Sequence, residues 1–242
     1  MSDWLSEHPD VQMISVALSD LNGQARGKRM PVRSAEKALS GGVRMPLSSL
    51  NVDILGHDIE NSPLVFETGD RDGVLIPTER GFVPMPWLST PTALLPVWMV
   101  TDTGAPFSGD PRRALASVLG RFQDRGLQVV AATELEFFLI DDEGDVLRPA
   151  ASPRSGRRRK GADMLGIRAL DAFDGFFSDL YAACDAMGIA ADTATSEAGA
   201  GQFEITLGHG PAMRAADDTW LFKMLTKGLA SGIVWAVGDK VK

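Results

Sequence analysis

Two segments in which glutamates alternate with large apolar residues constrain the fold more than any other feature of the sequence. They read TELEFFL, at residues 133–139, and GQFEITL, at residues 201–207. Because side chains two positions apart in a β-strand point to the same face, Glu134 and Glu136 should lie side by side, with the apolar residues on the opposite face. Glu204 alternates with apolar residues in the same way. The pattern predicts two strands that could be neighbours in one sheet.

Composition limits the classes of protein to which the chain can belong. Its 242 residues are 44% hydrophobic and 23% charged, which is typical of a globular protein with one large domain or two small ones. The net charge of −8 argues against a nucleic-acid or anionic-membrane partner and agrees with a site that gathers cations.

Cysteine usage and the apolar runs of the sequence indicate a compartment. The single Cys184 excludes an intramolecular disulfide and fits a reducing environment. The acidic N-terminal segment, MSDWLSEHPD, lacks the apolar core of a signal peptide. No apolar run approaches the ~20 residues that a membrane span needs. We therefore expect a cytoplasmic protein without a membrane partner.

Residues 1–105 are expected to form a small, mainly β domain. The Asn22-Gly23 pair lies between two segments of strand-like sequence and predicts a hairpin. Further short elements are expected at three places, namely strands within residues 50–56 and 72–77 and a short helix over residues 34–39.

Residues 106–242 are expected to form a second domain that opens with a helix. Asp110 is a good N-cap, Pro111 suits the first helical position, and Gly126 suits the C-terminal cap. A strand is expected to follow over residues 127–140.

An acidic turn, DDEGD, and a basic loop, SPRSGRRRKGAD, follow this strand. The loop spans residues 152–163 and could hold a phosphate, but a solvated loop is the more ordinary interpretation of such a charge run.

The clearest helix of the sequence lies within residues 170–188, LDAFDGFFSDLYAACDAMG. Its apolar residues recur at helical spacing, and Gly188 should end it. The stripe indicates core packing, so Cys184 is expected to be a buried structural thiol rather than a nucleophile. The order of elements predicts an α+β fold rather than a doubly wound parallel sheet.

Glu134, Glu136, Glu197 and Glu204 together need an explanation. Glu134 with Glu136, or Glu197 with Glu204, would alone be ordinary on the solvent-exposed face of a half-buried sheet. Two carboxylates ~5 Å apart, however, repel by roughly 3 kcal/mol at an effective dielectric near 20. A protein that gathers four must protonate some of them, separate them, or place cations between them. Hard cations accept all-oxygen ligation, so Mg²⁺ or Mn²⁺ is the expected ion.

Other chemistries fit the sequence less well. One cysteine and three scattered histidines, His8, His57 and His209, argue against zinc. A glycosidase-type pair of carboxylates remains an alternative, although no cluster of sugar-binding aromatic residues accompanies it. The GAGQFE segment does not suit a dinucleotide loop because a strand follows it, and there is no Walker-type loop. A nucleotide would therefore be held by metal ions and side chains.

These motifs, taken in order, resemble the glutamine synthetase superfamily. The resemblance rests on ATELEFF, on the run from ALDAFDGFF to GQFEITL, and on RAADDTWLFKMLTKGLA, with DLNGQARGKRMP and DPRRAL before them. It covers roughly residues 10–230 and is closer to the γ-glutamylpolyamine synthetase branch than to housekeeping glutamine synthetase. It implies a small β-grasp-like N-terminal domain followed by the first part of the family's catalytic domain, an antiparallel sheet with helices.

The resemblance also implies an activity. Members of this kind use ATP to ligate ammonia or a small amine to the γ-carboxylate of glutamate through γ-glutamyl phosphate. Glu136, Glu197 and Glu204 would bind the divalent metal ion, Mg²⁺ or Mn²⁺, that positions glutamate. Glu134 would face a second metal ion that neutralises the ATP phosphates.

Two further residues take roles only through the resemblance. Asp192 falls where the family places an acidic residue near the nucleotide. Asp53 lies roughly where the N-terminal domain offers an aspartate to the incoming ammonium across the interface of a homo-oligomeric ring. The motif around Asp53 differs here, so an ordinary turn aspartate is the alternative.

The end of the sequence departs from the family pattern. The family continues with a Gly-rich HxH-type segment and with loops that carry arginine and lysine, whereas this sequence reads SGIVWAVGDKVK from residue 231. His209 is expected to be structural and not to replace the missing histidine. A second hypothesis is therefore a truncated, catalytically inactive member that acts at most as an assembly or interaction subunit.

Overall fold

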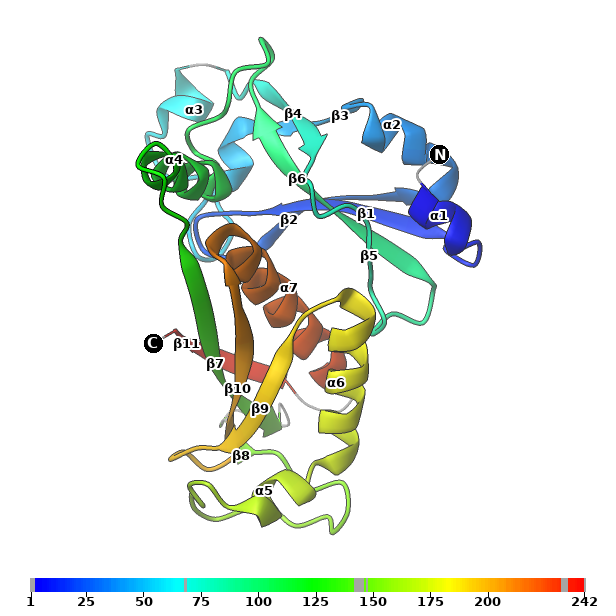
Figure 1. Cartoon of the computed structure of the whole chain (residues 1–242), viewed down its shortest axis with the longest axis vertical. Coiled ribbons are helices and arrows are strands. Elements are labelled where there is room, and N and C mark those ends of the chain that lie inside the picture. The colour runs from blue at the N-terminus through cyan, green and yellow to red at the C-terminus, as the bar shows by residue number, and fades with distance from the viewer. Residues whose placement is uncertain (1–2, 68, 142–145, 147, 232–234, 242) are drawn as a thin grey trace. The chain divides into compact units, whose positions relative to one another are not determined.

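The computed structural model describes residues 3–67, 69–141, 146, 148–231 and 235–241, with side chains described as far as residue 231. The chain divides into two compact units, residues 1–128 and residues 129–242 (Figure 1). Each unit combines helices with a predominantly antiparallel sheet. The fold is therefore α+β, as the sequence predicts.

The first unit contains short helices around a sheet. Its strands are β1 (Met13–Ser19), β2 (Ala25–Pro31), β3 (Val43–Pro46), β4 (Asp72–Pro77), β5 (Val83–Pro84) and β6 (Thr92–Val100). Its helices are α1 (Asp3–Glu7), α2 (Ala35–Leu39), α3 (Pro63–Phe66) and α4 (Pro111–Gln123), with 3₁₀ turns η1 (Val32–Ser34) and η2 (Leu47–Leu50).

The sheet of the first unit has the strand order β2-β1-β6-β4-β3, with β5 paired to β6. Strands β1 and β2 form the hairpin predicted at Asn22-Gly23, and Gly23 has the positive φ of 73° that such a turn needs. Strands β1 and β6 are parallel, whereas the other pairings are antiparallel. This arrangement agrees with the β-grasp-like N-terminal domain that the sequence resemblance implies.

Strand β6 forms the centre of the first core. Its sequence, TALLPVWMV, is almost continuously apolar, and all but one of its residues are buried. A strand that is covered on both faces reads as such a run rather than as an alternation. It packs with apolar residues of the neighbouring strands, among them Ile14, Val16 and Leu75, which are all fully buried.

The strand expected within residues 50–56 is not formed. The chain instead makes the 3₁₀ turn η2 and then a tight turn, in which the Asp53 carboxylate accepts hydrogen bonds from the backbone N–H groups of Leu55 and His57. A short aspartate side chain that bonds its own downstream backbone competes with a strand ladder. The apolar pattern alone did not reveal this competition.

Helix α4 lies in the first compact unit, which ends at residue 128, whereas the sequence predicts a second domain from residue 106. As predicted, Asp110 caps the helix, and its carboxylate accepts the N–H of Arg112. The other oxygen of Asp110 accepts the N–H of Met99 in β6, and the Asn51 amide donates to the carbonyl of Gly109. These hydrogen bonds join the start of the helix to the first sheet.

The second unit pairs long strands with two long helices. Its strands are β7 (Val130–Asp141), β8 (Arg148–Pro149), β9 (Ala191–Ser196), β10 (Gln202–Pro211) and β11 (Trp235–Val241). Its helices are α5 (Ile167–Asp171), α6 (Asp174–Met187) and α7 (Ala212–Ala230). The predicted helix that ends at Gly188 is α6, and Gly188 has the left-handed φ of 64° typical of a C-terminal cap.

The second sheet has the order β11-β7-β10-β9, with antiparallel pairings throughout. Helices α6 and α7 pack on one of its faces (Figure 1). On that face Phe203 of β10 contacts the rings of Phe173 and Phe177, at centroid distances of 5.5 and 5.3 Å. Phe137 of β7 joins the same cluster, so Phe137 and Phe203 contribute aromatic rings to the core beneath the helices.

The basic loop carries several local pairings. Arg158 forms an ion pair with Asp141, and Arg159 pairs with Asp163 at 2.6 Å. These pairs agree with a solvated loop. Most of the acidic turn DDEGD lies outside the described residues. No helix within the described part of the chain is long and apolar enough to cross a membrane.

Candidate functional site: a carboxylate face on the second sheet

The two strands with alternating glutamates are neighbours in the second sheet, as the sequence suggests they could be. Strands β7 and β10 pair in antiparallel register, with Glu204 opposite Glu136 and Thr206 opposite Glu134. Leu135, which alternates with these glutamates, is buried. Because side chains alternate between faces, the glutamates of β7 point away from the face that α6 and α7 cover.

Glu136 and Glu204 are the buried pair of this face. Their exposed fractions are only 6% and 9%. Side chains that are directly opposite in an antiparallel ladder have Cβ atoms about 4.5–5.5 Å apart. The two carboxylates therefore lie close together with little access to water. Such an arrangement is costly for two negative charges and suits a cation between or beside them.

Gln202 holds the Glu136 carboxylate in place. Its Nε2 donates to Oε2 of Glu136 at 2.7 Å, and its own Oε1 accepts the backbone N–H of Gly199 at 2.8 Å. Gln202 is not among the site residues predicted from the sequence. Its position two residues before Glu204, on the same face of the strand, was the signal that could have identified it.

The remaining glutamates are less buried. Glu134 is half-buried on β7, and Glu197 is half-buried directly after β9, where its backbone N–H donates to the carbonyl of Gln202 at 2.9 Å. Within the described residues, no group of three or more His, Cys, Asp or Glu side chains is arranged to hold a metal ion. The structure thus brings Glu136 and Glu204 together and does not gather Glu197 into a three-carboxylate group with them.

The donor set of this face nevertheless fits a hard divalent cation. Mg²⁺ keeps several water ligands and is usually bound through one or two carboxylates together with substrate phosphates. The buried pair Glu136 and Glu204 supplies such carboxylates, and the amide of Gln202 orients one of them. A dedicated cage of protein ligands is therefore not required.

Asp192 lies on strand β9 with an exposed side chain. Its backbone carbonyl accepts the hydroxyl of Tyr181 from α6 at 3.1 Å. This contact ties the strand to the helix, and it leaves the role of the Asp192 carboxylate toward a nucleotide as a prediction.

Asp53 belongs to the first unit and lies in the tight turn described above. Its Oδ1 accepts the N–H groups of Leu55 and His57 at 2.9 and 2.8 Å, and its Oδ2 lies 3.5 Å from Nδ1 of His57. The hydrogen bond from the His57 backbone lowers the pKa of this carboxylate, although desolvation opposes the change. Asp53 therefore has the geometry of a turn aspartate, while 41% of its side chain stays exposed for a ligand.

Cys184 agrees with its structural interpretation, and His209 lies on a strand. Cys184 is fully buried in α6, and burial raises the pKa of its thiol to about 12, as expected for an unreactive core cysteine. His209 is an exposed residue of strand β10 rather than of a loop.

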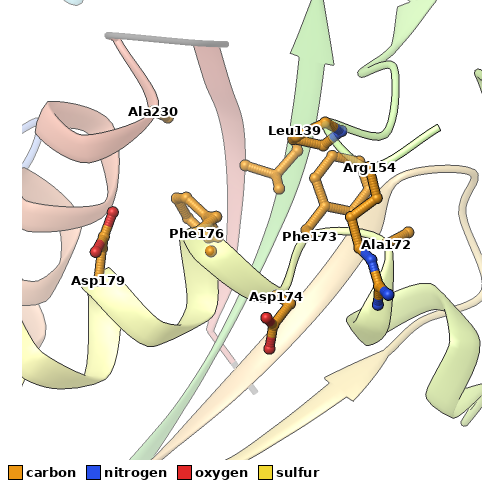
Figure 2. A pocket seen from close by; sticks show the side chains of 10 residues that line it. Leu139, Arg154, Ala172, Phe173, Asp174, Phe176, Asp179 and Ala230 are labelled. Carbon is orange, nitrogen blue, oxygen red and sulfur yellow. The ribbon is translucent and has the colours of Figure 1, made fainter. Parts of the chain in front are cut away.

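A small pocket of about 150 Å³ lies on the helix-covered face of the second sheet (Figure 2). Leu139 of β7 lies beside Phe173 and Phe176 in its apolar lining, and Asp174 and Arg154 contribute polar groups. Leu139 is an odd-numbered residue of β7, so this pocket opens on the face opposite to that of Glu136. It is not part of the carboxylate site.

The fold and the site define a class of protein: an α+β chain whose antiparallel sheet carries helices on one face and paired carboxylates on the other. The family model described as "Glutamine synthetase, catalytic domain" matches residues 108–233. The chain belongs to the glutamine synthetase family through this domain.

Individual relatives agree with this assignment. The chain is 34% identical over 231 residues to gamma-glutamylputrescine synthetase PuuA of Escherichia coli (strain K12), a match that covers 94% of this chain and 49% of the relative. It is 25% identical to a glutamine synthetase of Halobacterium salinarum, covering 93% of this chain and 46% of that protein. The chain thus spans about half the length of these relatives.

A solved structure confirms the fold. The crystal structure of a glutamine synthase homolog superposes with a TM-score of 0.79 at 24% sequence identity, and the match covers 96% of this chain and 54% of that chain.

Proposed function

We propose that the chain takes part in the ATP-dependent ligation of a small amine or ammonia to the γ-carboxylate of glutamate. The observation that carries the proposal is the antiparallel register that places the buried Glu136 opposite Glu204. Membership of the glutamine synthetase family and the similarity to a gamma-glutamylputrescine synthetase support this reaction over the glycosidase alternative.

In this proposal the carboxylate face holds the divalent metal ions. Glu136 and Glu204 would bind one ion, joined by Glu197 in the arrangement that the family resemblance implies, and Glu134 would face a second ion. The ions, Mg²⁺ or Mn²⁺, would neutralise the phosphates of ATP and the charge that develops during phosphoryl transfer. Asp192 would lie near the nucleotide.

The residues of the chain itself supply orientation. Gln202 fixes one oxygen of Glu136, so the carboxylate keeps a single direction before any ligand arrives. Because Gln202 is fixed in turn by the backbone of Gly199, the arrangement needs little further ordering when a metal ion binds. Asp53 would receive the positively charged amine.

A second candidate function is that of a non-catalytic subunit that associates with full-length relatives. It is favoured by the exposed apolar side chains of α4 and the residues that follow it. Val118 and Phe122 of α4 are 46% and 41% exposed, and Leu127, which follows the helix, is 52% exposed. Large apolar residues grouped on a surface often mark an interface.

One experiment distinguishes the two candidate functions. Purified chain is incubated with ATP, Mg²⁺, glutamate and either ammonia or putrescine, and phosphate release is followed. Glutamate-dependent release that falls by at least about 100-fold in Glu136→Gln, and is unchanged in the exposed surface variant Glu36→Gln, supports the ligase proposal. No release from the chain alone, together with co-purification with a full-length relative, supports the second candidate instead.

A further inference from the structure

The DLNGQAR segment, which belongs to one of the motifs that resemble the glutamine synthetase superfamily, forms more than a hairpin turn. It lies against the turn that carries Asp53, and both belong to the first unit. The N–H of Leu21 donates to the carbonyl of Leu50 at 3.0 Å. The side-chain amide of Asn22 donates to the carbonyls of both Val52 and Asp53, at 3.0 and 3.1 Å.

Asp20 makes the hairpin turn rigid. It is 1% exposed, and its Oδ1 accepts the backbone N–H groups of Asn22 and Gln24, both at 2.8 Å. Its Oδ2 pairs with Nε of Arg26 at 2.8 Å. A buried carboxylate that accepts this many hydrogen bonds leaves the turn a single conformation, so the amide of Asn22 is held in a fixed direction.

The guanidinium of Arg26 extends this support to the far side of the Asp53 turn. A Cβ atom added to Gly56 would lie 3.0 Å from Nη1 of Arg26, so the guanidinium packs directly against the backbone there. Gly56 has a φ of 89°, which favours glycine. The turn is thus held by Asn22 at one end and by Arg26 near the other.

The supported turn presents its side chains outward. Ile54 and Leu55 are 79% and 77% exposed, and the carboxylate of Asp53 lies beside them. Exposed apolar residues next to a carboxylate suit an alkylammonium ion, because the methylene groups and the charge each find a partner. A fixed loop loses less entropy than a mobile one when such a ligand binds.

We propose that Asn22, held by Asp20, is a positioning residue for amine recognition, because it fixes the Asp53–Leu55 turn against which the amine substrate binds. The inference rests on the proposed ligase function and adds a residue to it. Loss of Asn22 should weaken the use of the amine and leave the use of glutamate and ATP unchanged.

The first arm of the test needs no catalysis. In Asn22→Ala, the amide hydrogens of Leu55 and His57 should exchange with solvent about tenfold faster, since two hydrogen bonds that hold the turn are lost. Asn22→Ser, which keeps one donor, should fall between this variant and the wild type. Gln24→Ala is the matched control, because the Gln24 side chain is exposed in the same hairpin turn. Unchanged exchange in Asn22→Ala overturns the proposal.

The second arm is kinetic and uses the full chain with putrescine as the amine. The KM for putrescine should rise roughly tenfold in Asn22→Ala, whereas the KM values for glutamate and ATP should match those of Gln24→Ala. Faster exchange with an unchanged KM for putrescine would overturn the positioning role.

The two proposals fail in different ways. If the wild-type chain shows no glutamate-dependent turnover, or if Asp53→Asn leaves putrescine use unchanged, the ligase function or the role of Asp53 fails. The exchange arm still decides whether Asn22 fixes the turn.

Discussion

Glu136 of β7 and Glu204 of β10 are directly opposite each other in an antiparallel ladder, and less than a tenth of either residue is exposed. Like charges in this position normally destabilise a sheet. The helices of the second unit cover the other face of the strands, so packing against them does not explain why glutamates occur here. The metal ion of the proposed function would give the pair a physical reason.

The first prediction concerns this pair and Mg²⁺. Without Mg²⁺, replacing Glu204 by glutamine should leave the protein equally stable or raise its free energy of unfolding by about 0.2–1 kcal/mol, because one of two like charges is removed. Millimolar Mg²⁺ should raise the thermal midpoint of the wild type but not that of Glu204→Gln, since a ligand stabilises only the form that binds it. Calorimetry with and without EDTA measures both effects.

Glu36→Gln is the control for this prediction, because Glu36 is an exposed residue of α2 in the first unit. Its midpoint should respond to Mg²⁺ as the wild type does. An equal response of Glu204→Gln would show that the ion binds elsewhere.

Much of the fold follows from local sequence signals. The Asn22-Gly23 hairpin, the Asp110 cap and the Gly188 terminus are each fixed by one or two residues whose backbone preferences are strong, and the structure has all three. Alternation of polar and apolar residues likewise predicted β7 and β10. The sequence indicated only that these strands could be neighbours, and the structure pairs them.

One expectation fails mainly for a local reason. Residues 50–56 have an apolar pattern, but the Asp53 carboxylate accepts the backbone N–H groups of Leu55 and His57 and makes a turn. The amide of Asn22, which lies far from this turn in sequence, donates to the carbonyl of Val52 and supports the turn. That second contact has no signature within a short window of sequence.

Only part of the candidate site could be predicted from the sequence. Strand periodicity predicts the face to which Glu136 and Glu204 point but not that they are opposite each other, and the position of Glu197 depends on the conformation of the turn between β9 and β10. In that turn Gly201 has a φ of 77°, and the side chain of Gln202 binds the backbone of Gly199. Periodicity does not extend into such a segment.

The second prediction compares Gly188, which follows helix α6, with Gly175 in the first turn of that helix. Gly188→Ala should lower the free energy of unfolding by about 1–2 kcal/mol, because an L-residue resists its left-handed φ of 64°. Space is not the limit, since an added Cβ would lie 3.6 Å from the nearest atom, Nη2 of Arg214. Gly175→Ala, in the first turn of the same helix, should instead be neutral or stabilising by up to about 1 kcal/mol. Urea unfolding of both variants gives the comparison, and equal losses would contradict the assigned cap.

The third prediction concerns Cys184. Burial is the main reason that the pKa of its thiol is raised to about 12, so the native protein at pH 8 holds almost no thiolate at this position. We expect labelling by a disulfide reagent to be at least about 100-fold slower in the native protein than in 6 M guanidinium. The raised folded-state pKa also means that this group favours folding below the unfolded pKa and loses that contribution as the pH rises toward 12. Rapid native labelling would show that α6 opens.

The last prediction tests the cap of α4. Asp110 is 1% exposed, and burial raises the pKa of its carboxyl although the N–H groups of Met99 and Arg112 oppose the shift. In Asp110→Asn only the amide oxygen can accept a hydrogen bond, whereas the N–H groups of Met99 and Arg112 both need an acceptor. The substitution should therefore lower the free energy of unfolding by about 1–2 kcal/mol. Because the folded-state pKa is raised, the wild type has the full contribution of this group below the unfolded pKa and loses it as the pH rises through the folded pKa.

The difference in the free energy of unfolding between the wild type and Asp110→Asn should therefore become smaller as the pH rises from 4 to 8. Urea unfolding at several pH values measures it, with Asp124→Asn as the control, since Asp124 is exposed at the other end of α4. That control should differ from the wild type by no more than about 0.5 kcal/mol at each pH. A difference that widens with pH would mean that the two N–H donors outweigh burial, and that the carboxylate of Asp110 stabilises the start of the helix most strongly when it is ionised.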